Sequence, residues 1–91
     1  MVKYHIVKRK GHEEHFDERK VYKSCYAACL SAHVARKDAD VICKKATKEI
    51  TQWIKTRKEV TTHQISKEII RVLKRHDKNA AFMYETHRDV S

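Results

Sequence analysis

Two periodicities follow one another along the chain, a short alternating stretch and then a long helical pattern. Residues 2–7 alternate in apolar and polar character, which is typical of a half-exposed β-strand. Residues 12–16 have the character of a second short strand. Because Gly11 allows a tight turn next to Lys10, we predict a small β-hairpin at the start of the chain.

Beyond residue 16, apolar side chains recur every three or four residues, which predicts helices. Asp17 is a favourable N-cap for a first helix that ends near His33. Asp38 is placed to cap a second, longer helix that stops by Glu59. The apolar positions of the two helices are Val21, Cys25, Ala28, Cys29 and Ala32, followed by Ile42, Ala46, Ile50, Trp53 and Ile54.

Two further helices complete the predicted layout. Thr61 and Gln64 have the spacing of a capping box before a third helix that ends near His76, and Asp77 caps a short fourth helix. The narrow apolar stripes of the helices imply that they pack on one another. The predicted fold class is therefore α+β, with a small β-hairpin of two or three strands as a lid packed on a four-helix bundle.

Composition favours one small domain, residues 1–91, and argues against an enzyme. The chain has 91 residues, 41% of them hydrophobic, which is enough for one modest core but not for a deep catalytic cleft. Neither a secretory signal nor an apolar run of membrane-spanning length occurs in it, so we expect a cytoplasmic protein. Cys25, Cys29 and Cys43 are expected to be buried, reduced and structural.

A net charge of +9 favours an anionic partner, but charge alone leaves nucleotides, nucleic acids and acidic proteins open. The most informative segment is residues 5–22. Its turn brings together Lys8, Arg9 and Lys10, three cations that suit a polyphosphate. The first helix starts soon after this turn, and the free backbone N–H groups of a helix start also attract anions.

Two separated motifs extend this picture. The first consists of Val7-Lys8-Arg9-Lys10-Gly11, Glu14, Phe16-Asp17 and Lys20-Val21, and the second is Val60-Thr61-Thr62-His63-Gln64-Ile65. In their order they resemble the ATP-cone, the nucleotide-sensing domain of many ribonucleotide reductases and of the repressor of their genes. Residues 80–89 also resemble the last helix of that family. With no reductase barrel after it and no Cys-x-x-Cys pairs before it, a free-standing cone is expected.

The resemblance implies an adenine-nucleotide site, and it implies a role for particular residues. Lys8, Arg9, Lys20 and Arg88 would contact phosphates, although strand alternation places Lys8 and Arg9 on opposite faces. Thr62 would add a hydroxyl at the start of a helix.

Recognition of the base is implied for a second group of residues. Glu14 and Asp17 would accept hydrogen bonds from the adenine amino group, and Ile6 and Val21 would flank the ring. Ser66 lies where members of the family vary and where ATP and dATP are told apart.

The implied ligand is ATP or dATP, bound reversibly without hydrolysis and compatible with a Mg²⁺ ion on the polyphosphate. The implied role is allosteric regulation, with a separately encoded ribonucleotide reductase subunit or another copy of the chain as the protein partner. Lys10 departs from the family, which usually has Asp before the glycine. This departure leaves the detail of the turn open.

Three other interpretations remain open. A basic surface could bind nucleic acid, and a cone with a decayed site could be a protein-interaction module. A zinc site is disfavoured because Cys25 and His33 are ~12 Å apart along a helix. No histidine pairs with a nucleophile by spacing, so no catalytic residue is assigned. The basic surface consists of Lys44, Lys45, Lys48, Lys67, Arg71, Lys74 and Arg75.

Overall fold

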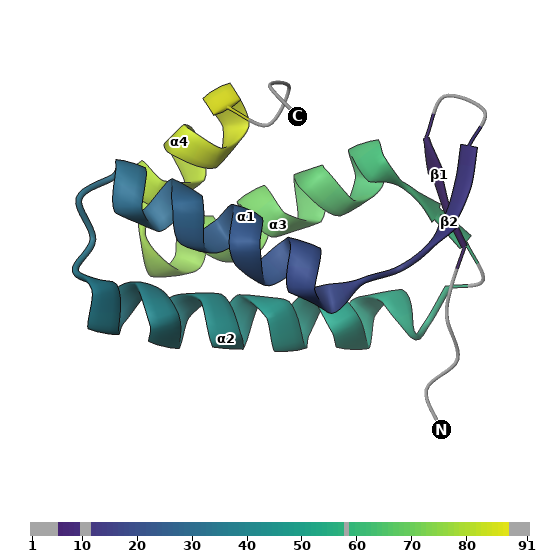
Figure 1. Ribbon diagram of the computed structural model, residues 1–91, viewed down its shortest axis with the longest axis horizontal. Helices are drawn as coiled ribbons and strands as arrows, with labels where there is room; N and C mark the ends of the chain where they lie inside the picture. Colours follow the sequence, from purple (N-terminus) through teal and green to yellow (C-terminus); the bar gives the residue numbers. More distant parts are fainter. Residues whose placement is uncertain (1–5, 10–11, 58, 88–91) are drawn as a thin grey trace.

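The computed structural model describes residues 6–9, 12–57 and 59–87, and of residues 6–9, 12–15 and 87 it describes the backbone. Along this part of the chain, two strands are followed by two helices, and a third strand is followed by two more helices (Figure 1). In order they are β1 (Ile6–Arg9), β2 (His12–His15), α1 (Glu18–Ser31), α2 (Arg36–Ile54), β3 (Glu59–Thr61), α3 (Thr62–His76) and α4 (Lys78–His87). Within the described ranges, no helix is both long enough and apolar enough to cross a membrane.

The strands pair in the order β2-β1-β3, so β1 is central. β1 runs antiparallel to β2, with Lys8 opposite Glu13, and parallel to β3, with Lys8 opposite Thr61. A parallel neighbour needs a crossover connection, and here α1 and α2 together provide it. β1 therefore holds the start of the described chain next to the segment that leads into α3.

The prediction of an α+β fold, with a hairpin lid packed on a helical bundle, is wrong. Helices make up 81% of residues 16–57 and 59–86, so the structure is mainly helical. β1 and β2 stand at one end of the helices and do not cover them (Figure 1). The helices bury their apolar stripes on one another, because α1 packs on α2 and α4 while α3 packs on the same two helices. That packing already covers the apolar stripes of the helices, and β1 and β3 contact α3 beside them.

α1 begins and ends close to its predicted limits. Asp17 is the N-cap, as predicted, and its Oδ1 accepts a hydrogen bond from the backbone N–H of Arg19 at 3.0 Å. The helix ends at Ser31, and His33 turns the chain away with a left-handed φ of 65°. The backbone N–H of Val34 then donates to the carbonyl of Cys29 at 3.0 Å, which closes the last turn.

α2 begins before its predicted cap and ends within its predicted limit. It begins at Arg36 after Ala35, which makes no side-chain cap bond, so the prediction that Asp38 caps this helix is wrong. Asp38 lies in the first turn, where its charge favours the helix dipole without capping. The helix ends at Ile54. Glu59 begins β3, and the β-branched residues that follow Glu59 favour a strand.

The other two helix starts agree with the sequence. Thr61 and Gln64 form the predicted capping box, with each side chain bonded to the backbone of the other residue. α3 ends at His76, as predicted. The Asp77 carboxylate accepts from the backbone N–H of Ala80 at 3.0 Å, which confirms it as the cap of α4.

The core contains many small side chains. All three cysteines are fully buried, which confirms the burial predicted for them, and none is in a disulfide in this structure. The Sγ atoms of Cys29 and Cys43 are 3.9 Å apart, joining α1 to α2. Hydrogen bonding with Cys25, together with burial, raises the pKa of the Cys43 thiol to about 12, so it stays neutral. The rest of the core consists of Val21, Ala28, Ala39, Ala46, Ile50, Ile54, Val60, Ile69, Val72, Leu73, Ala80, Ala81 and Tyr84.

A polar contact on the rim of the core also joins α1 to α2. The Tyr22 hydroxyl donates to the Asp40 carboxylate, which Lys44 also contacts at 3.1 Å. The Tyr22 ring stacks on Tyr26, with ring centroids 5.8 Å apart. The hydrogen bond to Asp40 is the main cause that raises the pKa of Tyr22, to about 12, and the same bond lowers the pKa of Asp40.

Replacing Thr61 with Ala removes the hydroxyl that accepts from the Gln64 backbone N–H at 3.0 Å. We expect this change to lower the free energy of unfolding by ~1 kcal/mol, measured by urea denaturation. His63→Ala, an exposed substitution in the same turn, is the matched control and should change it by less than ~0.5 kcal/mol. Equal effects of the two substitutions would contradict the capping role of Thr61.

Replacing Tyr22 with Phe should destabilise the protein in a pH-dependent way. The raised pKa of Tyr22 gives stabilisation that is fully present below 10.0 and is lost as the pH rises through about 12. The lowered pKa of Asp40 gives stabilisation that is present above 3.8 and is lost as the pH falls through its folded-state pKa. Thermal midpoints of the wild type and Tyr22→Phe should therefore differ at neutral pH and converge at both extremes.

Tyr26→Phe is the matched control for this pH profile, because its ring stacks on Tyr22 and its hydroxyl makes no contact with Asp40. A pH-independent difference for Tyr22→Phe would argue against the bond to Asp40 as its cause.

Candidate functional site

The sheet brings together the two motifs that the sequence singles out. Lys8 of the first motif is the register partner of Thr61 of the second, across the parallel pair of β1 and β3. Glu14 on β2 is the register partner of Val7, on the other side of the central strand. Segments about fifty residues apart in the chain are thus neighbours at one end of the molecule (Figure 1).

Two helix starts border this sheet. α1 begins at Glu18, three residues after the end of β2, and α3 begins directly after β3. Because β2 runs antiparallel to β1 and β3 parallel to it, β2 leads into α1 from the Ile6 end of β1, and β3 leads into α3 from the Lys8 end. Each helix start presents free backbone N–H groups and the positive end of its dipole, which favour an anion, but the two starts lie at opposite ends of the short strands and on either side of β1.

Asp17 is already engaged within the chain. Besides capping α1, its carboxylate accepts from the Arg19 guanidinium, at 3.3 Å on Oδ1 and 3.4 Å on Oδ2. These hydrogen bonds from the Arg19 side chain and backbone lower the pKa of Asp17, so the group is ionised and can only accept. A carboxylate has about four acceptor positions, and Arg19 occupies two on Oδ1 and one on Oδ2.

The remaining candidate residues are placed to different extents. Lys20 is exposed in the first turn of α1, one turn past Asp17, whereas Val21 is only 4% exposed and belongs to the core. Thr62 and Ser66 are half-buried at the start of α3, one helical turn apart. The backbones of Ile6, Lys8, Arg9 and Glu14 lie in β1 and β2. Lys10, Gly11 and Arg88 lie outside the described residues.

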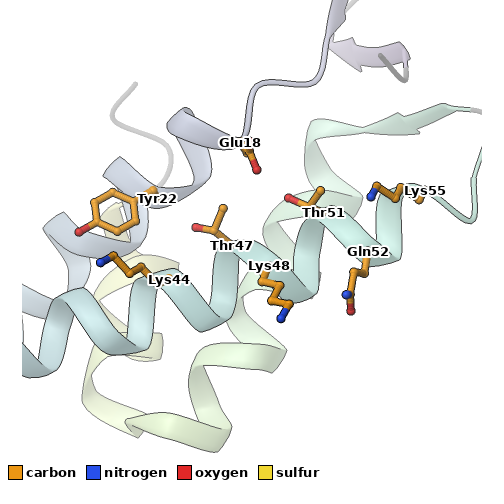
Figure 2. Close-up of a pocket in the computed structure, with 8 residues that line it drawn as sticks. All are labelled: Glu18, Tyr22, Lys44, Thr47, Lys48, Thr51, Gln52 and Lys55. Carbon is orange, nitrogen blue, oxygen red and sulfur yellow. The ribbon is translucent and has the colours of Figure 1, made fainter. Parts of the chain in front are cut away.

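A groove between α1 and α2, which sequence reasoning missed, has a volume of about 350 Å³ (Figure 2). It starts at the first turn of α1, yet none of the candidate nucleotide residues lines it. Its lining residues from α2 recur at helical spacing, a signal that the sequence contains but that also describes an ordinary solvated face. They are Lys44, Thr47, Lys48, Thr51, Gln52 and Lys55, opposite Glu18 and Tyr22 of α1.

The polarity of this groove is mixed. Thr47 and Thr51 project toward the start of α1, whereas Lys48 and Gln52 project away from it (Figure 2). The Thr47 and Thr51 hydroxyl oxygens are buried and have no hydrogen-bond partner within the part of the chain that is described. Because Glu18 faces them from α1, the groove combines both signs of charge.

The basic surface proposed for nucleic acid is partly neutralised on α3. Arg71 pairs with Glu68 on the same helix, and Arg75 pairs with Glu49 on α2. His76 lies 3.9 Å from the same Glu49 carboxylate. These acidic partners compete with phosphates for the two arginines, which weakens the case for a nucleic-acid interface.

No group of three or more metal-ligating side chains comes together among the residues that the structure describes. Of the two residues weighed from the sequence as ends of a zinc site, Cys25 is fully buried in the core, whereas His33 is exposed just after α1.

Comparison with known protein families gives a match to the ATP cone domain over residues 4–89. Neither the curated proteins nor the solved structures compared with the chain gave a match. The matched range includes both motifs, the strands that join them and all four helices. On this match, the chain belongs to the ATP-cone family.

Proposed function

We propose that this chain is a regulatory domain that binds ATP or dATP without hydrolysing it. The observation that carries the proposal is the family match over residues 4–89, in which the two nucleotide motifs meet through the pairing of Lys8 with Thr61. A nucleotide-binding regulatory role follows from membership of the family. The particular contacts below are our proposal.

The polyphosphate lies at the sheet, between the two helix starts. Lys20 and the first turn of α1 hold it from one side, and Thr62 at the start of α3 holds it from the other. Lys8 and Arg9 of β1, together with Arg88, add positive charge, and a Mg²⁺ ion is compatible with the bound polyphosphate.

The adenine base lies near β2 and the start of α1. Asp17 has one acceptor position left on Oδ2, and Glu14 supplies a second carboxylate for the amino group of the base. Ile6 is the apolar neighbour of the ring, and Val21 contributes the small part of its surface that the core leaves exposed. Ser66, one turn past Thr62, is the residue that distinguishes ATP from dATP.

Binding is proposed to change a contact with another protein, which makes the chain an allosteric sensor. The partner is either a separately encoded ribonucleotide reductase subunit or another copy of this chain. A location in the cytoplasm stays a prediction from the sequence.

Replacing Lys20 with Ala should weaken ATP binding about tenfold to hundredfold, because a charge-assisted contact is worth ~1.5–3 kcal/mol. Isothermal titration calorimetry measures this loss directly. Lys45→Ala removes the same charge from an exposed position on α2 and should change the affinity less than about twofold.

Equal losses from the two variants would indicate binding by net charge alone and would contradict the proposed site. In that case, salt-dependent binding of duplex DNA would become the better account of the basic surface. Circular dichroism of Lys20→Ala establishes that the variant is folded before its affinity is compared.

A further inference from the structure

The outer face of α4 carries an exposed aromatic ring between two opposite charges. Phe82 is 61% exposed, more than any other large hydrophobic side chain in the described part of the chain. Lys78 lies four residues before it and Glu85 three residues after it, so the three share one helix face. Together with Lys74 of α3, they line a hollow of about 320 Å³.

The two charges on this face oppose the dipole of their own helix. Lys78 is the first residue of α4, at the positive end, and Glu85 lies in the last turn, at the negative end. Neither makes an ion pair with any residue that the structure describes. Charges that oppose the helix dipole, with no ion pair inside the chain to compensate them, indicate a surface where a partner supplies the opposite charges.

We propose that α4 is the interface of a symmetric dimer, in which it lies antiparallel to α4 of a second copy of this chain. A two-fold interface is self-complementary, so Lys78 meets the partner's Glu85 while Glu85 meets the partner's Lys78. Phe82, between the two charges, packs against the partner's Phe82, and the hollow beside it accommodates that ring. The positive end of each α4 then lies next to the negative end of the other.

The order of charges identifies a second copy as the occupant. An acidic partner would place a negative charge against Glu85, and a basic partner would place a positive charge against Lys78 and Lys74. An antiparallel copy of the same face satisfies both ends at once. Because α4 has ten residues and is only about 15 Å long, the contact is small, and the dimer depends on protein concentration.

Sedimentation velocity over a range of protein concentrations, without nucleotide, tests this inference independently of the proposed nucleotide site. Lys78→Glu and Glu85→Lys, each alone, turn both interchain pairs into like charges and should weaken the dimer about tenfold, or ~1.4 kcal/mol. The double variant Lys78→Glu/Glu85→Lys restores opposite charges in both pairs and should regain the wild-type association. Phe82→Gln should leave the chain monomeric.

Lys45→Glu is the matched control, since it makes the same charge change on α2 and should leave the dimer unaffected. Loss of folding does not explain the expected result, because Lys78→Glu and Glu85→Lys both improve the match between charge and helix dipole and should not lower the thermal midpoint. A wild-type chain that stays monomeric at its highest soluble concentration would overturn the proposal. Failure of the double variant to restore association would overturn it as well.

Discussion

Close contact between α1 and α2 is the constraint on which the rest of the structure depends. The two helices meet through small, fully buried side chains, and the Cys29 and Cys43 sulfur atoms lie 3.9 Å apart in this contact. Larger side chains there would force the helices apart, at a cost of ~1–3 kcal/mol each. Because α1 and α2 together form the crossover between β1 and β3, their separation also sets where β3 returns to the sheet.

The returning strand brings the two sequence motifs together. β3 brings Thr61 next to Lys8 and starts α3 directly afterwards, while β2 leads into the Asp17 cap of α1. The starts of α1 and α3 therefore follow two strands on either side of β1, at opposite ends of the sheet, although the long stretch of chain between them packs elsewhere. The groove between α1 and α2 and the exposed face of α4 are separate surfaces and lie outside this arrangement.

Local signals in the sequence were sufficient to predict the helices, whereas the sequence did not reveal how distant elements pack on one another. The caps at Asp17, Thr61 and Asp77 follow from side chains that bond within three residues, so the pattern alone predicts them. The capping role predicted for Asp38 was wrong because an acidic residue in the first turn and an acidic N-cap look alike in sequence. The lid was wrong because periodicity identifies an apolar stripe without revealing which element covers it, and here other helices do. The Arg19 guanidinium donates to both carboxylate oxygens of Asp17, and the spacing of residues in the sequence did not predict this contact.

The most direct test of the nucleotide site is a titration of the isotope-labelled chain with ATP and, separately, with GTP, followed by backbone amide chemical shifts. ATP is expected to shift the amides of β1, β2 and the first turns of α1 and α3, and to leave the middle of α2 unchanged. A much weaker response to GTP is also expected, because its carbonyl oxygen would face the carboxylates of Glu14 and Asp17, a mismatch of ~1–3 kcal/mol. Shifts gathered along Lys44 to Lys55 of α2, or an equal response to both nucleotides, would contradict the proposed site.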